Sequence, residues 1–190
     1  MLYAVEKIIA FGHDERGAVL AETVIVLPTL LWSYLALFVY WDAFRATNEV
    51  QKASYTISDI ISREMRTVPP TYVSGIKNVA EFLVDTNQNV SLRVTSITYD
   101  EDDLQFEVLW SSTTDSTGMP ALTTTTLQDL KSRIPNMKDA DFATIVETQM
   151  LYEPAFNVGL SDQILTQFIV TRQRFLSPFC MRGQPTCTPV

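Results

Sequence analysis

Hydrophobic residues are unevenly distributed along the chain, and the first long feature is a continuous apolar run. From Ala18 to Trp41 the only charged residue is Glu22. An α-helix over these 24 residues would extend roughly 36 Å, enough to cross a hydrocarbon core of about 30 Å. Tyr40 and Trp41 close the run, where aromatic side chains commonly meet the membrane interface. A buried core helix is the alternative, but such helices rarely run so long without a polar face. The pattern therefore predicts a transmembrane helix over 18–41.

The helical pattern continues beyond the apolar run. Apolar residues now recur every three or four positions, which predicts an amphipathic extension of the same helix over 42–68: Val50, Ala53, Ile57, Ile60, Ile61, Met65 and Val68. Pro69 and Pro70 force an end. One helix from about Val19 to Arg66 would be roughly 70 Å long. We expect Pro28 to kink its membrane half, which membrane helices tolerate.

The remaining residues, 69–190, predict short elements. In order they are a helix over 74–84, strands over 90–99 and 104–111, a short helix near 127–134, and strands over 144–152 and 167–175. These strands predict a small antiparallel sheet, one face of which needs a cover. The amphipathic half of the long helix is the natural cover. The fold class predicted is therefore α+β, a long N-terminal helix packed on a small antiparallel β-sheet domain.

Three details of this domain are predicted from local pattern. Leu104, Phe106, Val108 and Trp110 alternate with polar residues, so we expect them to share one buried face. The segment 112–124 is rich in Ser and Thr and contains Gly118 and Pro120. It is expected to be an exposed, mobile loop. In the helix over 74–84, we expect an apolar stripe of Ile76, Val79, Ala80 and Leu83.

Length, charge and residue usage narrow the function. The chain of 190 residues has a formal charge of −8 and no basic run, which disfavours nucleic-acid binding. His13 is the only histidine, so a Ser-His or Cys-His couple is not expected once the N-terminal segment is removed. No Gly-rich phosphate loop is present in the sequence, and Asp100–Asp103 is expected to be a solvated turn. We therefore expect no enzyme activity, metal or cofactor.

The segment before the apolar run does not have the order of a secretory signal peptide. The polar stretch GHDERG immediately precedes the run, and the run is long enough to stay in the membrane. Cleavage after Gly17 would leave the span attached to the domain, with Glu22 as the fifth residue of the mature chain. A carboxylate in a membrane span is costly. One explanation is that the Glu22 side chain reaches toward the lipid headgroups. The other is that Glu22 neutralises the α-amino group of a neighbouring subunit in a filament, and this pairing sets the axial register between the two helices.

At this junction the sequence resembles a known family. The stretch from Glu15 to Pro28, ERGAVLAETVIVLP, is similar to the N-terminus of the TadE/TadG-like pseudopilins of the Tad (Flp) pilus system. The shared pattern is a charged pair, Gly, four small or apolar residues, Glu, and a long apolar run containing Leu-Pro. Thr23 departs from it, because an aromatic residue usually follows the glutamate. The segments 144–154 and 167–175 are similar to the two closing strands of TadE-like domains.

The resemblance implies a domain organisation and a function. Residues 1–17 would be a prepilin-type leader, cut by a prepilin peptidase between Gly17 and Ala18, and 69–190 would be a periplasmic α+β domain of pilin type. The mature single-pass subunit would wait in the bacterial inner membrane, with other pilin and pseudopilin subunits and an inner-membrane assembly platform as partners. It would take part in assembly of a pilus that reaches the cell surface. Glu22 would be the family's acidic residue.

Cys180 and Cys187 are the only cysteines and lie near the C-terminus. A metal site would need more ligands than this pair supplies. In a reducing cytosol they would be two idle thiols, whereas in an oxidising periplasm they would form a disulfide. Basic residues on the two sides of the span balance and do not decide its orientation. We favour the disulfide, which places the C-terminal domain outside the cytosol.

Two rival functions remain open at this stage. One is a permanently anchored periplasmic scaffold of a secretion or envelope complex, which differs only in keeping its leader. The other is a membrane-tethered enzyme of an unfamiliar kind, which would require a deep pocket with perturbed acids.

Overall fold

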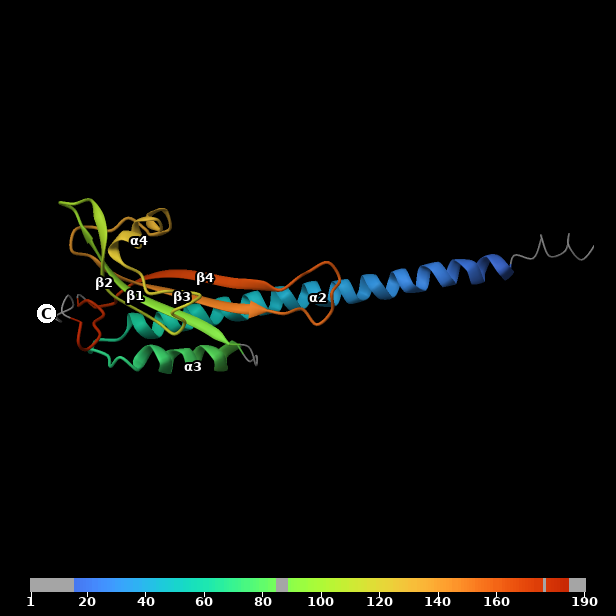
Figure 1. Cartoon of the computed structure of the whole chain (residues 1–190), viewed down its shortest axis with the longest axis horizontal. Helices are drawn as coiled ribbons and strands as arrows, with labels where there is room; N and C mark the ends of the chain where they lie inside the picture. Colours follow the sequence, from blue (N-terminus) through green and yellow to red (C-terminus); the bar gives the residue numbers. More distant parts are fainter. Residues whose placement is uncertain (1–15, 85–88, 176, 185–190) are drawn as a thin grey trace, which may run out of the picture. The chain divides into compact units, whose positions relative to one another are not determined.

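The computed structural model describes residues 16–84, 89–175 and 177–184. Their elements, in chain order, are helices α2 (Arg16–Ser62) and α3 (Tyr72–Val84), strands β1 (Val90–Asp100) and β2 (Gln105–Thr113), helix α4 (Thr124–Gln128), the 3₁₀ helix η1 (Lys131–Arg133), and strands β3 (Phe142–Tyr152) and β4 (Gln163–Arg172) (Figure 1). The predicted α+β layout, a long N-terminal helix and a small antiparallel sheet, is confirmed.

The chain divides into two compact units. The first combines α2 as far as Asp42 with the loop Pro154–Ser161, which joins β3 to β4. The second contains the rest of α2 from Ala43, helices α3 and α4, and the sheet.

Helix α2 is continuous over 47 residues and includes Pro28. It ends at Ser62, a few residues before the prolines that were expected to stop it. The N–H groups of Arg63 and Glu64 donate to the carbonyls of Ile60 and Ile61, at 3.2 and 3.1 Å. These three-residue steps tighten the last turn and satisfy carbonyl groups that a helix end leaves free.

The four strands form one antiparallel sheet in the order β2-β1-β3-β4. All four predicted strands are present, with boundaries shifted by a few residues. Strand β3 is central, and residues of both its faces are buried. Successive side chains of a strand point to opposite faces, so the two faces of β3 have different covers.

The amphipathic part of α2 covers one face, as predicted. Ser54 Oγ lies 2.6 Å from Thr148 Oγ1 of β3. One helical turn further on, the Ser58 hydroxyl bonds that of Thr171 in β4. The interleaved apolar residues Val50 and Ile57 are buried. Helix and sheet are therefore joined by apolar packing together with hydroxyl pairs that satisfy one another.

The opposite face of the sheet is covered as well, which the sequence did not predict. The cover is the segment between β2 and β3, which contains α4 and η1. Four of its residues pack in a buried cluster with residues of β1, β2 and β3: Leu122, Leu127, Ile134 and Met137. The segment 112–124 was expected to be an exposed, mobile loop, and its exposure is confirmed only in part, since residues 116–118 are exposed but others are buried. Met119 is buried, and Arg93 Nη1 donates to the Pro120 carbonyl at 2.5 Å.

A β-bulge divides the apolar residues of β2 between the two faces. Val108 pairs with Ile97 and Trp110 with Ser96, so Leu109 is the extra residue. An extra residue in one strand reverses the facing of everything beyond it. Phe106 and Val108 pack in the cluster described above, whereas Trp110 Nε1 donates to the Phe179 carbonyl at 2.5 Å. The expectation that Leu104, Phe106, Val108 and Trp110 share one buried face is therefore wrong, and Leu104 is exposed with φ of 51°.

The C-terminal segment is hydrogen-bonded to the stretch of chain that connects α2 to α3. Val68 N–H donates to the Cys180 carbonyl at 3.0 Å, and Arg182 N–H donates to the Val68 carbonyl at 2.8 Å. The ring of Phe179 packs edge-on against Tyr72, with centroids 5.8 Å apart. Burial raises the pKa of the Tyr72 phenol to about 12, because the phenolate is the charged form.

The apolar stripe of α3 is rotated from the predicted one. Ile76 and Ala80 are buried as expected, but the stripe is completed by Val73 and Val84. The remaining two predicted positions, Val79 and Leu83, are partly exposed.

Candidate functional site: the apolar half of α2 and Glu22

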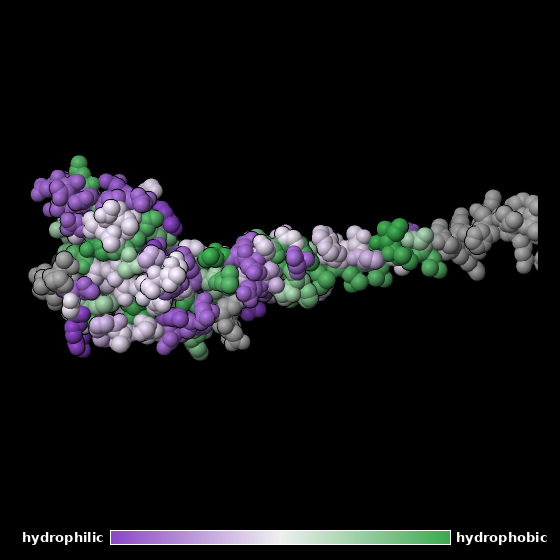
Figure 2. Space-filling model, viewed as in Figure 1, coloured by the Kyte–Doolittle hydropathy of each residue, from purple (hydrophilic) through white to green (hydrophobic). Residues whose placement is uncertain are grey.

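The first half of α2 exposes many large hydrophobic side chains, and Figure 2 shows them as green patches among paler residues. Among the described residues this is the one helix long and apolar enough to cross a membrane. Its most apolar stretch has a mean hydropathy of 1.9, and only 6% of that stretch is buried. A core helix of a soluble protein would be mostly buried, so the low burial favours lipid or other helices as its surroundings. By length and composition the helix could serve as a membrane anchor or as a signal sequence.

The hydroxyl groups in this apolar stretch are satisfied within the helix. Thr23 Oγ1 donates to the Val19 carbonyl at 2.8 Å, and Thr29 Oγ1 donates to the Ile25 carbonyl at 2.9 Å. Each bond returns one turn along the helix, the arrangement by which threonine is tolerated where no water is available.

Glu22 differs from these threonines, because its side chain has no hydrogen-bond partner among the described residues of the helix. Its side chain is exposed, and within the described part of the chain it forms no hydrogen bond or ion pair. It lies at one end of a surface groove along the helix, lined also by Thr23, Val26, Leu27 and Leu30. Residues 22, 26 and 30 are one turn apart, so the carboxylate heads an apolar row. A second helix packed along that row would bring its own groups to Glu22.

The predicted cleavage site lies at the start of α2. Gly17 and Ala18 belong to the first turn of the helix, which begins at Arg16. The rest of the predicted leader, residues 1–15, lies outside the described residues. Cleavage between Gly17 and Ala18 stays a prediction.

Only one of the two cysteines of the predicted disulfide lies among the described residues. Cys180 is buried and disulfide-bonded. Cys187 lies outside the described residues, so the pairing of the two cysteines stays a prediction. The backbone bonds of Cys180 and Arg182 to Val68 place this disulfide where the chain leaves α2.

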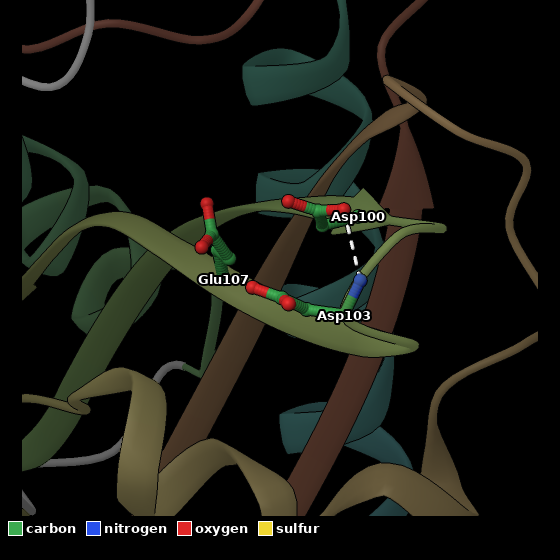
Figure 3. A group of neighbouring side chains, drawn as sticks. All are labelled: Asp100, Asp103 and Glu107. Atoms are coloured by element: carbon green, nitrogen blue, oxygen red, sulfur yellow. Dashed lines mark hydrogen bonds between the residues drawn. The ribbon is translucent and has the colours of Figure 1, made fainter.

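Three carboxylates gather at the β1–β2 turn (Figure 3). Oxygen atoms of Asp100, Asp103 and Glu107 lie within 4.8 Å of one another. Asp100 stabilises the turn, because its Oδ1 accepts hydrogen bonds from the N–H groups of Asp102 and Asp103 at 2.9 and 3.3 Å. An aspartate commonly stabilises a tight turn in this way. The sequence indicated the acidic turn but not Glu107, which β-pairing brings alongside.

The carboxyl groups with lowered pKa values have local structural causes. The pKa of Asp59 is lowered first by its hydrogen bond with Arg63, and also by Arg174. The pKa of Asp115 is lowered by the N–H groups of Gly118 and Thr117, which its Oδ1 accepts at 3.0 Å each. Both shifts favour the ionised form, whereas a general acid would need a raised pKa.

A buried ion pair between β1 and β3 was not predicted. Arg93 Nε and Nη2 donate to Glu147 Oε2 and Oε1 at 2.6 and 2.8 Å, and both side chains are nearly buried. With the third bond to Pro120, the guanidinium joins two strands to the segment that covers them. A two-pronged pair of this kind satisfies both charges.

Comparison of the chain with protein-family models, curated proteins and solved structures found no match.

Proposed function

We propose that this protein is a minor pseudopilin of a Tad (Flp)-type pilus. A prepilin peptidase cuts between Gly17 and Ala18, and the mature subunit waits in the inner membrane with its sheet domain in the periplasm. Extraction into a filament then exchanges lipid contacts of the apolar helix for contacts with neighbouring helices. The work of extraction comes from an assembly platform.

The observation that carries the proposal is the state of Glu22. Its carboxylate is exposed on an otherwise apolar helix, five residues after Gly17, and it has no partner among the described residues. An unpaired carboxylate and an unpaired ammonium are each costly in a low-dielectric medium, and their pairing removes both costs. Cleavage after Gly17 supplies such an ammonium on every subunit. The same cut therefore creates the N-terminus and the partner that Glu22 requires.

The groove below Glu22 supports the same arrangement. A neighbouring helix packed along Val26 and Leu30 would be guided axially by the charged pair at its end. Apolar packing alone permits sliding by one turn at small cost, whereas a single charged pair specifies one register, as buried polar residues do in coiled coils. Glu22 thus sets the axial position of a subunit rather than the strength of its packing.

The decisive experiment is the mass of the mature protein. Intact-mass analysis of the native protein, recovered from its host membrane, is expected to show loss of residues 1–17 and an N-terminus at Ala18. Gly17→Leu is expected to abolish this loss, because a large side chain crowds the peptidase site. Lys7→Ala, inside the leader but away from the junction, is the control and is expected to be processed normally.

The alternative is a permanently anchored periplasmic scaffold, which shares the helix and the domain. It predicts a native protein that still begins at Met1. Recovery of that species from a host whose peptidase processes other pilins would overturn the pseudopilin proposal and leave a membrane-tethered domain.

A further inference from the structure

The loop Pro154–Ser161 belongs to the same compact unit as α2 up to Asp42. In this part of α2, Val39 is only 1% exposed, although its neighbours Phe38 and Tyr40 are 45% and 44% exposed. Val158 in the loop is also buried, at 8%. The loop lies beside this part of α2 (Figure 1), and each of the two contains a buried valine, Val39 in the helix and Val158 in the loop.

A turn in the loop separates a buried apolar residue, Val158, from an exposed one, Phe156. The Val158 N–H donates to the Phe156 carbonyl at 3.1 Å, and Gly159 follows with φ of +99°, a conformation that favours glycine. Val158 is therefore buried, while Phe156 stays 47% exposed. The loop sequence PAFNVGLS carries no charge.

Helix geometry sets the depth of this contact. Val39 follows Val19 by 20 residues, which corresponds to about 30 Å along the helix axis, the thickness of a hydrocarbon core. If the span begins near Val19, Val39 lies at the opposite edge of the core. The loop beside this part of the helix then lies at the boundary between hydrocarbon and headgroups, close to the level of Tyr40 and Trp41.

We propose that the β3–β4 loop is a second membrane contact, with Phe156 inserted among the lipids beside the anchor helix. Aromatic side chains favour this interfacial level, and an exposed apolar side chain there leaves water without needing a protein partner. Glu153 and Asp162 flank the loop on either side. Their charge opposes binding to anionic lipids, so the ligand is a zwitterionic lipid surface. The inference rests on the membrane-spanning part of the proposed function, and neither cleavage nor pilus assembly enters it.

The test is spin-label accessibility in the full chain, reconstituted in phosphatidylcholine nanodiscs. The label is attached in two separate variants, Phe156→Cys and Asn157→Cys, so that the result does not depend on replacing the phenylalanine itself. Leu31 in the middle of the span is the lipid control, and Thr117 in an exposed turn is the aqueous control. The disulfide-bonded Cys180 does not react with a thiol-specific label. The ratio of collision rates with oxygen and with a polar nickel chelate reports depth.

The ratio at Phe156 is expected to be several-fold above that at Thr117 and below that at Leu31, with Asn157 between Thr117 and Phe156. Aqueous values at both Phe156 and Asn157, with a deep Leu31, would overturn the inference while leaving the span intact. In that case Phe156 is free to contact another protein. Aqueous values at Leu31 itself would overturn the span, and with it both proposals.

Discussion

Glu22 and Glu147 are carboxylates in apolar surroundings, and the chain treats them in opposite ways. Glu147 receives two guanidinium bonds from Arg93 and is nearly buried. Glu22 receives none from the described residues. A charge in low dielectric is costly unless paired, so Glu147 completes an internal interaction, whereas under the proposed function Glu22 pairs with a group of a neighbouring subunit. This contrast makes Glu22 the residue on which the proposed assembly depends.

Replacing Glu22 is expected to separate processing from assembly. Glu22→Ala should leave cleavage after Gly17 largely intact but lower incorporation into filaments at least about tenfold, since a charged group in a membrane span is worth more than about 1.4 kcal/mol. The measurement compares subunit in sheared filaments with subunit in membranes, and mass analysis checks cleavage. Thr23→Ala is the neighbouring control, because its hydroxyl bonds only its own helix. Normal incorporation of Glu22→Ala would refute the pairing of Glu22 with an N-terminus.

Residue chemistry could be predicted where it was local and not where it depended on pairing. Glu22 is conspicuous because every neighbour in sequence is apolar or small. Arg93 and Glu147 are 54 positions apart, and only the β1–β3 register places them opposite one another. Glu107 joins Asp100 and Asp103 for the same reason, across the β1–β2 turn.

At the scale of elements, α2 serves two environments without a break. Its first half exposes apolar residues, and its second half buries one stripe against the sheet. Both halves were predictable, because a continuous apolar run and a three-to-four-residue period are separate local signals. Strand β2 was predicted as an element, but its facing was not. Nothing in its alternation indicates that Leu109 is skipped in the pairing with β1.

Shifting the strand beyond the bulge is therefore expected to be far more harmful than removing the bulged side chain. Insertion of one alanine between Leu109 and Trp110 would turn Trp110 and its successors to the opposite face, and it should destabilise the full chain by at least about 3 kcal/mol or prevent folding. Leu109→Ala keeps the register and should cost about 1 kcal/mol. Urea unfolding in detergent micelles, followed by tryptophan fluorescence, measures both. Equal stability of the two variants would show that the facing of Trp110 is unimportant.

At the scale of the whole molecule, the second unit contains its own core. The sheet is covered on one face by α2 from Ala43 onward together with α3, and on the other by the segment that carries α4 and η1. The C-terminal segment is bonded to Val68 within the same unit. With both faces of the sheet covered, the core of this unit is buried within the unit itself.

A chain truncated to residues 43–190 is therefore expected to fold without detergent. It should be monodisperse in buffer, show the circular dichroism of a mixed helix and sheet protein, and unfold cooperatively on heating. The full chain, with its exposed apolar helix, is the control and should require detergent or lipid. A truncated chain that aggregates or melts without a cooperative transition would show that residues before Ala43 are needed for the sheet to fold.

By itself the sequence determined the features that arise from neighbours along the chain. These are the long helix with its change of character near Trp41, four antiparallel strands, and an isolated carboxylate in an apolar run. The tertiary structure decided what depends on strand register and on contacts between distant segments. It placed Trp110 and Phe106 on different faces, paired Arg93 with Glu147, covered the second face of the sheet, and buried Val39 in the unit that contains the β3–β4 loop. The physical reason is that helical periodicity and hydropathy are local properties, whereas a single extra residue in a strand reverses its facing.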